Sequence, residues 1–268
     1  MNAPKHSPSI KGYLLDMDGV LYHGMHALKD APAFIQRIQD TPTRFITNNP
    51  IHPPKVITER LSLMGFTGIQ HTQIITSAMA TCLWLQQQKP NFQYFAIGAQ
   101  GLHDELNHAG TFNAEQADFV VVGEGPGLDY EQLSIGIELI LNKGAKLVGT
   151  NPDLTVDSMK DGKHQILPGG GALIAPFIAA TQVQATIIGK PEPLLYEMAL
   201  QDLGLKPEEC LMIGDRPDTD IQGAAVLGMQ TALVRTGRFS PGTPYPAGFH
   251  KPNWDVSSLT ELSASLSL

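Results

Sequence analysis

Short apolar runs that stop abruptly at a polar residue recur along this chain, and this pattern constrains the fold more than any other feature. Each run is short and flanked by turn residues, which is typical of a buried strand in a parallel sheet. Helical patterns lie between the runs, and strands that alternate with helices predict an α/β fold with a doubly wound parallel sheet. The runs and their end points are Tyr13-Leu14-Leu15 at Asp16, Arg44-Phe45-Ile46 at Thr47, Thr186-Ile187-Ile188 at Gly189-Lys190, and Cys210-Leu211-Met212-Ile213 at Gly214-Asp215.

The spacing of these runs predicts a second domain inserted into the first. Asp16 and Thr47 are 31 positions apart, and Lys190 and Asp215 are 25 apart, so each pair suits one βαβ unit. Thr47 and Lys190 are 143 positions apart, which is far too many for one crossover. We therefore predict a core at residues 1–78 and 185–268 and an inserted α/β domain at 79–184. Within the insertion the expected strands are Phe92–Ile97, Phe119–Val122 and Lys146–Val148, and the expected helix is Tyr130–Lys143.

Two carboxylates two residues apart follow the first apolar run. Gly19 permits a tight turn, so Asp16 and Asp18 can face one pocket beyond the carboxyl ends of the strands. At this position Asp16 can attack phosphorus and form an aspartyl phosphate. Asp18 can protonate the leaving alkoxide and then activate the hydrolytic water. The pair therefore predicts phosphoryl transfer through a covalent intermediate.

A metal site is predicted from the acidic residues at the ends of the first and last of these runs. Mg²⁺ binds carboxylate and carbonyl oxygens, and Asp16, the backbone carbonyl of Asp18 and Asp215 would provide them. Asp220 has two interpretations at this point. It either ligates the metal through water or orients Asp215 and Lys190.

The two remaining strand ends supply groups that bind phosphate oxygens. Lys190 offers a cation for the negative charge that Asp16 and the phosphate share. Thr47, with the backbone N–H groups near Asn48 and Asn49, offers hydrogen-bond donors. Each motif alone has a plainer interpretation as a turn, a helix cap or a solvated loop. Their joint occurrence after apolar strands, at βαβ spacing, favours the catalytic interpretation.

These segments resemble the motifs of the haloacid dehalogenase-like hydrolase superfamily, and the resemblance covers essentially the whole chain. Finer features resemble its subfamily IIA, the NagD-like and 4-nitrophenylphosphatase-like sugar phosphatases. The motif-like segments are Asp16–Leu21, Thr47–Asn49, Lys190-Pro191 and Gly214–Ile221, and the branch features are Leu21–Gly24, the doubled Asn after Thr47, and Gly149–Asp153.

The resemblance implies a Rossmann-like core, an inserted α/β cap domain, an Mg²⁺ cofactor and small phosphorylated metabolites as substrates. It also implies that the loop carrying Asn151 and Asp153 faces the active site, although an Asx/proline turn without ligand contact is an equal alternative. Glu124 and Asp129 are expected to be solvated. The substrate stays open among sugar phosphates, glycerol phosphate, phosphoglycolate, nucleoside monophosphates, pyridoxal phosphate and p-nitrophenyl phosphate.

Two other function classes remain alternatives to a phosphatase. Receiver-type switches also place acidic residues, a Thr and a Lys around Mg²⁺, but they are about half this length and lack a cap. Such a protein would accept phosphate without turnover. A dehalogenase or a phosphomutase could use the same scaffold, although Asp18 disfavours a dehalogenase because displacing a halide needs no leaving-group acid.

Charge and cysteine usage limit the partners and the compartment. The formal net charge is −8 and no Lys/Arg cluster stands out, so we expect no nucleic-acid partner, and no apolar run suggests a membrane span. The amino-terminal segment lacks the apolar region of a signal peptide. Cys82 and Cys210 are far apart, which suits a reducing cytoplasm. A homodimer stays open, because caps of this type can dimerise.

Overall fold

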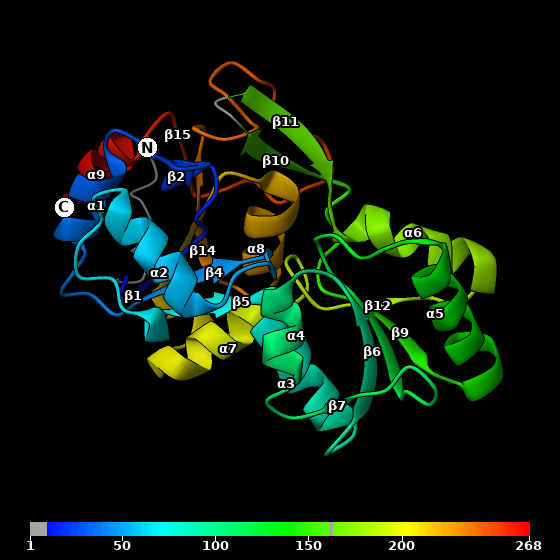
Figure 1. Ribbon diagram of the computed structural model, residues 1–268. Coiled ribbons are helices and arrows are strands. Elements are labelled where there is room, and N and C mark those ends of the chain that lie inside the picture. The colour runs from blue at the N-terminus through cyan, green and yellow to red at the C-terminus, as the bar shows by residue number, and fades with distance from the viewer. Residues whose placement is uncertain (1–9, 161–162) are drawn as a thin grey trace. The chain divides into compact units, whose positions relative to one another are not determined.

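Two sheets organise the computed structural model, which describes residues 10–160 and 163–268 (Figure 1). The amino-terminal nine residues, on which the expectation about a signal peptide mainly rests, lie outside the described residues. The chain divides into two compact units, one formed by residues 10–46, 61–73 and 196–268, and the other by 47–60, 74–160 and 163–195. The predicted α/β class, with a parallel core sheet and a separate parallel cap sheet, is confirmed.

The six-stranded sheet is doubly wound, and its centre lies between its first and its fourth strand in chain order. From the first strand the chain moves outward to one side, and after the insertion it returns to the other side of that strand. This reversal creates a topological switch point, where ligands of open parallel sheets bind. The order of the sheet is β15 (Trp254–Val256), β14 (Gln230–Val234), β13 (Cys210–Gly214), β1 (Gly12–Leu15), β4 (Thr43–Thr47) and β5 (Ile74–Thr76).

The strands at this switch point pair in parallel and in a register that aligns their carboxyl ends. Leu15, the last residue of β1, lies opposite Ile213 of β13. The N–H of Asp16 then donates to the carbonyl of Ile213 at 2.9 Å. On its other side β1 pairs with β4, with Leu15 opposite Phe45. Every residue of strands β1, β13 and β14 is buried, as expected for strands covered on both faces.

Helices and short elements complete the part of the chain around this sheet. Helix α7 (Leu194–Leu203) follows two prolines and ends before Gly204, which is the usual asymmetry of proline at a helix start and glycine at its end. The elements are β2 (Tyr22–His23), β3 (His26–Ala27), α1 (Ala31–Arg37), α2 (Pro54–Leu63), η1 (His71–Gln73), α7 (Leu194–Leu203), η2 (Pro207–Glu209), the π-helix η3 (Pro217–Ile221), α8 (Gln222–Val226) and α9 (Leu259–Leu266).

The five-stranded sheet has helices on both faces, with α3 and α4 on one side and α5 and α6 on the other (Figure 1). Phe177 of α6 and Ile140 of α5 pack on Val120 and its neighbours in a buried apolar cluster. The order of the sheet is β12 (Thr186–Ile187), β9 (Lys146–Gly149), β8 (Phe119–Val122), β6 (Gln93–Ile97) and β7 (Thr111–Phe112), and its helices are α3 (Ser77–Gln88), α4 (Gln100–Leu106), α5 (Tyr130–Lys143) and α6 (Gly170–Thr181).

The boundaries of α5 coincide with the prediction because both ends carry local stop signals. Asp129 caps the first turn, where its side chain accepts from the N–H of Gln132. Gly144 ends the helix in the left-handed conformation at φ 78°. An antiparallel hairpin of β10 (Thr155–Lys160) and β11 (Lys163–Pro168) separates β9 from α6, and the sequence analysis did not predict it.

One strand assignment made from the sequence is wrong. The run before Lys190 was expected in the same sheet as β1, but β12 pairs in parallel with β9 and lies at the edge of the second sheet. Thr186 lies opposite Val148 and Ile187 opposite Gly149. In the chain, helix α6 lies between β9 and β12. It therefore serves as the crossover that connects these two neighbouring parallel strands. The predicted domain boundaries, with 79–184 as the inserted part, stay a prediction.

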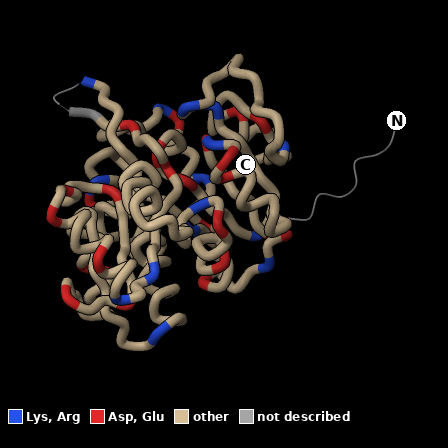
Figure 2. The backbone as a smooth tube through the Cα atoms, turned by 90° about the vertical axis from the view of Figure 1, so that its right-hand side faces the viewer, with Lys and Arg blue, Asp and Glu red and all other residues tan. Residues whose placement is uncertain are grey.

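Charge and hydropathy along the chain set a simple background for the site. Lys and Arg are interspersed with Asp and Glu along the described chain (Figure 2). Within residues 10–160 and 163–268, none of the helices is both long and apolar enough to cross a membrane.

The carboxylate of Asp118, just before β8, binds the start of β6 and a nearby lysine. Its carboxylate accepts from the N–H of Gln93 at 2.8 Å and from Lys89 Nζ at 2.7 Å. Burial acts to raise the pKa of Asp118, but the hydrogen bond from Gln93 and the charge of Lys89 outweigh burial and hold that pKa below its ordinary value. A carboxyl group with a lowered pKa stabilises the fold above its unfolded-state pKa, and the stabilisation is lost as pH falls through the folded-state value.

We therefore expect Asp118→Asn to lower the free energy of unfolding at pH 7 by about 0.5 kcal/mol, a value that allows for solvent screening. The difference from wild type should shrink at pH 3, where the wild-type carboxyl group also takes up a proton. Urea unfolding at both pH values measures it, with the exposed Asp104→Asn as a matched control. A deficit of equal size at both pH values would contradict the assignment.

Candidate active site

Three buried carboxylates lie together at the topological switch point of the six-stranded sheet, beyond the ends of β1 and β13. Asp16 follows β1, Asp215 follows β13, and Asp220 lies in η3. One ligand oxygen of each lies within 4.8 Å of the other two, and the exposed fractions of the three residues are 8%, 5% and 0%. Negative charges this close repel one another, and burial strengthens the repulsion because little water is present to screen it. The cluster therefore favours any positive charge that can enter it.

The electrostatics of Asp215 show how strong this effect is. Burial raises the pKa of its carboxyl group well above the ordinary value, and the charges of Asp16 and Asp220 raise it further. The N–H of Arg238 and the charge of Arg216 act in the opposite direction without cancelling the effect. A set of carboxylate oxygens is the donor type that hard divalent cations bind. Asp16, Asp215 and Asp220 together could hold such an ion.

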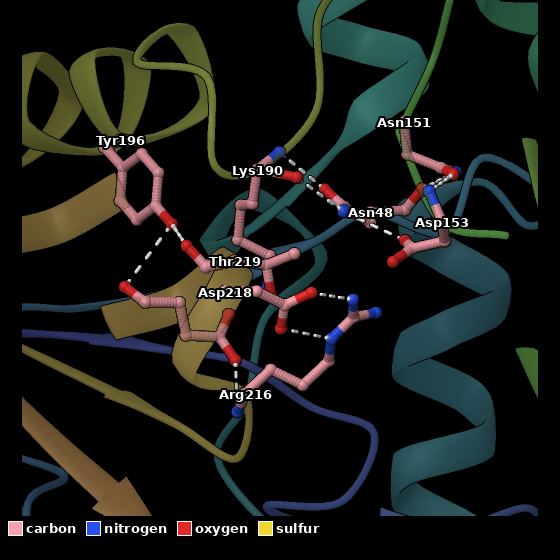
Figure 3. A network of polar contacts seen from close by, with 9 residues as sticks. Asn48, Asn151, Asp153, Lys190, Tyr196, Arg216, Asp218 and Thr219 are labelled. Atoms are coloured by element: carbon pink, nitrogen blue, oxygen red, sulfur yellow. Dashed lines mark hydrogen bonds and ion pairs between the residues drawn. The ribbon is translucent and has the colours of Figure 1, made fainter. Parts of the chain in front are cut away.

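Asp220 is positioned by a hydrogen bond to its side chain, by a hydrogen bond to the preceding residue and by a glycine that leaves room for it. Its Oδ2 accepts from the N–H of Arg216 at 3.1 Å. The hydroxyl of Tyr196 donates to the carbonyl of Thr219 at 2.7 Å, which fixes the preceding peptide (Figure 3). Gly214 is required at the end of β13, because a Cβ atom there would overlap the Asp220 side chain. These contacts orient a carboxylate that the neighbouring charges would otherwise push away.

The segment after β14 closes against Asp215 and the loop that carries Asp18. Thr236 Oγ1 donates to the carbonyl of Gly19 at 2.6 Å, and the N–H of Arg238 donates to Asp215 Oδ2 at 3.2 Å. A Cβ atom at Gly237 would collide with Asp215 Oδ2. Gly19 adopts φ 77°, and a Cβ atom there would lie 2.5 Å from the same oxygen. Side chains at either glycine would therefore displace the carboxylate.

Asp18 differs from Asp16 in its exposure to solvent. It lies two residues beyond Asp16 and is exposed, whereas Asp16 is buried. The hydroxyl of Tyr22 makes a long contact of 3.4 Å with its Oδ2. An exposed carboxyl group can exchange protons with water, so this position suits proton transfer.

A second polar network lies in the other compact unit and centres on Asn48, directly after β4 (Figure 3). Asn48 Oδ1 accepts from the N–H of Lys190 at 2.7 Å, and Asn48 Nδ2 donates to the carbonyl of Lys190 at 3.0 Å. The same Nδ2 donates to Asp153 Oδ2 at 3.0 Å. Lys190 is itself buried, at 2% exposed. One amide side chain thus clamps the backbone of Lys190 from both sides.

The Asn151 loop joins this network from the end of β9. Asn151 Nδ2 donates to the carbonyl of Asn48 and to Glu124 Oε1, both at 2.8 Å. Its Oδ1 accepts from the N–H of Asp153 at 3.1 Å, which makes the expected Asx turn. Ser77 Oγ also donates to the carbonyl of Asn48, at 2.6 Å. The turn and the network therefore coexist in one loop.

Thr47 ends β4 and begins this loop. Its Oγ1 accepts from the N–H of Asn49 at 3.1 Å, and Asn49 Oδ1 accepts from the N–H of Ile51 at 2.8 Å. Because the Thr47 oxygen accepts from the backbone, its own O–H hydrogen is directed elsewhere. The N–H of Asn49 was expected to bind a phosphate oxygen, but in this turn it donates to Thr47 Oγ1. Thr47 thus keeps a hydroxyl donor on a rigid turn.

The structure brings the expected site residues together in two groups. Asp16, Asp215 and Asp220 form the carboxylate cluster, with Asp18 and Gly19 on the adjoining loop. Thr47 and its two neighbours share the second network with Lys190 and the Asn151 loop. The members of the second group are Thr47, Asn48, Asn49, Asn151, Asp153 and Lys190.

Sequence reasoning was wrong about one carboxylate and missed several supporting groups. Glu124 was expected to be solvated, but it is 2% exposed and accepts from Asn151. Its position two residues beyond β8 is the same strand-end signal that located Asp16, and it could have been read that way. Tyr196, Ser77 and Thr236 carry no comparable signal, because their partners are remote in sequence.

Tyr196 provides a test of the support under Asp220. Burial raises the pKa of its phenol well above the ordinary value, followed by the charges of Asp220, Asp16 and Asp218, so the hydroxyl stays protonated and donates. We expect Tyr196→Phe to lower the free energy of unfolding by about 1–3 kcal/mol, because a buried carbonyl loses its donor. Thermal unfolding measures the loss.

The exposed Tyr130→Phe is the matched control, since the same hydroxyl is removed from a solvated helix start. Its melting temperature should equal that of wild type. Equal melting temperatures for both variants would show that the Tyr196 hydroxyl does not support the loop.

Two family models match the chain. One is described as haloacid dehalogenase-like hydrolase and matches residues 13–111, which include Asp16 and Thr47. The other is described as HAD-hydrolase-like and matches residues 187–262, which include Lys190 and Asp215. The matched segments thus contain the residues of the carboxylate cluster and much of the second network.

Curated relatives and solved structures cover nearly the full length. The chain is 35% identical over 254 residues to the 5'-nucleotidase YutF of Bacillus subtilis, covering 94% of this chain and 96% of the relative. It is 36% identical over 231 residues to an acid sugar phosphatase of Staphylococcus epidermidis, covering 85% and 87%. The structure of NagD from E. coli superposes with a TM-score of 0.82 at 28% identity, covering 94% and 98%.

Proposed function

Because the chain belongs to the haloacid dehalogenase-like hydrolases, in their NagD-like branch, we propose that Asp16 is the nucleophile of a phosphatase acting on small phosphorylated metabolites. The observation that carries this proposal is the meeting of three buried carboxylates beyond β1 and β13, with an exposed carboxyl group two residues along the chain. Such a cluster is costly unless it serves a cation and an anionic substrate.

In the first step Asp16 attacks the phosphorus atom of a phosphomonoester. A bond forms between a carboxylate oxygen of Asp16 and phosphorus, while the bond from phosphorus to the ester oxygen breaks. The leaving oxygen takes a proton from Asp18, so the alcohol departs neutral. The exposure of Asp18 supports this role, because an exposed carboxyl group can reach both the leaving oxygen and, in the next step, a water molecule.

In the second step water hydrolyses the aspartyl phosphate. Asp18, now a carboxylate, removes a proton from water as the water oxygen bonds to phosphorus. The bond from phosphorus to Asp16 breaks, which releases inorganic phosphate and regenerates both carboxyl groups in their starting states. Phosphate oxygens need donors throughout, and we assign this role to the Thr47 hydroxyl and the Lys190 ammonium group. The rigid turn at Thr47 supports that assignment.

Mg²⁺ is the cation we assign to the carboxylate cluster. Asp16, Asp215 and the backbone carbonyl of Asp18 would hold it, and Asp220 would either ligate it through water or orient Asp215. The all-oxygen donor set and the raised pKa of the Asp215 carboxyl group support the assignment. When bound, the ion neutralises the cluster and polarises a phosphoryl oxygen.

The relatives narrow the substrate class to be tested first. One is a 5'-nucleotidase and another an acid sugar phosphatase, so nucleoside monophosphates and sugar phosphates head the panel. Glycerol phosphate, phosphoglycolate and p-nitrophenyl phosphate complete it. A cytoplasmic location, which the two buried free cysteines support, and a homodimer remain further predictions.

Asp16→Asn tests the nucleophile. We expect this variant to lose at least about 10³-fold in kcat on p-nitrophenyl phosphate while keeping the wild-type melting temperature or exceeding it, because one buried negative charge is removed. Phosphate release measures turnover, and the exposed Asp40→Asn is the control. A variant that turns over at the wild-type rate would exclude Asp16 as nucleophile.

The same assay separates the alternatives. One phosphate released per protein, without further turnover, would identify a phospho-accepting switch instead. Transfer of phosphate within the substrate without release would identify a mutase, and release of halide from a haloacid would identify a dehalogenase.

Removal and return of the metal tests the cation site with a readout independent of turnover. Mg²⁺ added to protein pretreated with a chelator should raise the melting temperature, since binding at 100 times Kd stabilises the fold by about 2.7 kcal/mol. Asp215→Asn should weaken this response strongly. An equal shift in wild type and variant would place the ion elsewhere.

A further inference from the structure

Glu124 is a buried carboxylate that the proposed reaction does not use. It lies two residues beyond β8 at 2% exposure and accepts from Asn151 Nδ2 at 2.8 Å. A buried carboxylate is costly to retain without a task, because its charge has been taken out of water. Its partner Asn151 is fully buried, at 0% exposed. The pair therefore has a role inside the protein rather than at its surface.

Protein groups engage both donor hydrogens of the Asn151 amide. Its Nδ2 donates to Glu124 and to the carbonyl of Asn48, and its Oδ1 accepts from the N–H of Asp153. An Asn amide has two donor hydrogens, and here each has an acceptor. Glu124 cannot donate when ionised, so it can accept only from the nitrogen end of the amide. Glu124 thereby fixes which end of Asn151 faces Asn48.

The position of Asn48 in turn sets the position of Lys190. The backbone carbonyl of Asn48 accepts from Asn151 and Ser77. The Asn48 side chain forms hydrogen bonds with both the N–H and the carbonyl of Lys190. Asn48 also follows Thr47 directly in the chain. The Thr47 turn is therefore linked to the Lys190 backbone through the Asn48 side chain, and Asn151 holds the backbone carbonyl of the same Asn48.

We propose that Glu124 is a positioning residue of the phosphatase, which orients Asn151 and through Asn48 fixes the spacing between Thr47 and Lys190. This inference rests on the proposed function, in which Thr47 and Lys190 contact the transferring phosphoryl group. Their spacing matters because a misplacement of about 1 Å can cost about 10²-fold in rate. Asn48 and Asn151, which the sequence analysis assigned to substrate, act here as supports.

The positioning role has a signature that distinguishes it from substrate selection and from general stability. The phosphoryl group is common to all substrates, whereas the alcohol part differs. Loss of the Glu124 contact should therefore lower kcat by the same factor on every phosphomonoester, with KM changed much less. A residue that selects substrate would alter the ratio between substrates instead.

The experiment compares Glu124→Leu, Glu124→Gln and wild type on p-nitrophenyl phosphate and on a nucleoside monophosphate. Leucine has a similar volume but no acceptor, and we expect it to lower kcat about 10- to 100-fold on both substrates. Glutamine keeps an acceptor oxygen for Asn151 and should recover most of the rate. Asn48→Ala combined with Glu124→Leu should lose no more than Asn48→Ala alone, because both changes break one linkage. The exposed Glu138→Leu serves as a surface control.

Three results would overturn the proposal: wild-type kcat in Glu124→Leu, a loss that differs between the substrates, or additive losses in the double variant. Should Glu124→Leu not fold, Glu124→Asp replaces it, since the shorter side chain withdraws the acceptor from Asn151, and a wild-type kcat there also overturns the proposal. A wild-type protein without turnover would overturn the proposed function and this inference with it. Wild-type turnover with an unaffected leucine variant overturns the inference alone.

Discussion

Mutual repulsion among three buried carboxylates is the constraint around which this fold is arranged. Asp16, Asp215 and Asp220 bring like charges within 4.8 Å of one another, and burial removes the water that would screen them. The backbone holds the carboxylates together because β1 and β13 pair in parallel with aligned ends, and because nearby glycines leave room for the side chains. An arrangement that opposes stability in this way is typical of a functional site, and binding of a cation would relieve the repulsion.

The network around Asn48 has the opposite physical character. Its amide groups are matched with acceptors and donors at 2.7–3.1 Å, so it is a fully connected set of hydrogen bonds. Such networks favour one geometry over others that would leave buried groups unsatisfied. In the proposed reaction the carboxylate cluster provides the nucleophile, and the network provides a fixed frame for the groups we assign to phosphate. A phosphatase needs both, because phosphoryl transfer depends on positioning and on charge stabilisation.

Local signals made much of the fold predictable. The end points of α5 follow from Asp129 and Gly144, and the carboxylate cluster follows from the rule that parallel strands align their carboxyl ends. The sequence did not indicate which sheet β12 joins, because a strand of two residues has too short a pattern to identify its partner. The burial of Glu124 was missed although its position just beyond β8 is a strand-end signal, because an acidic residue is solvated by default and its partner Asn151 is 27 positions away.

A crystal structure of the protein with Mg²⁺ and trifluoroberyllate, a mimic of the phosphoryl group, tests the central claim most directly. The account predicts beryllium bonded to a carboxylate oxygen of Asp16, the ion in contact with Asp16 and Asp215, and fluorine atoms within hydrogen-bond distance of Thr47 and Lys190. Beryllium on another residue, or an adduct on Asp16 that neither Thr47 nor Lys190 contacts, would contradict it.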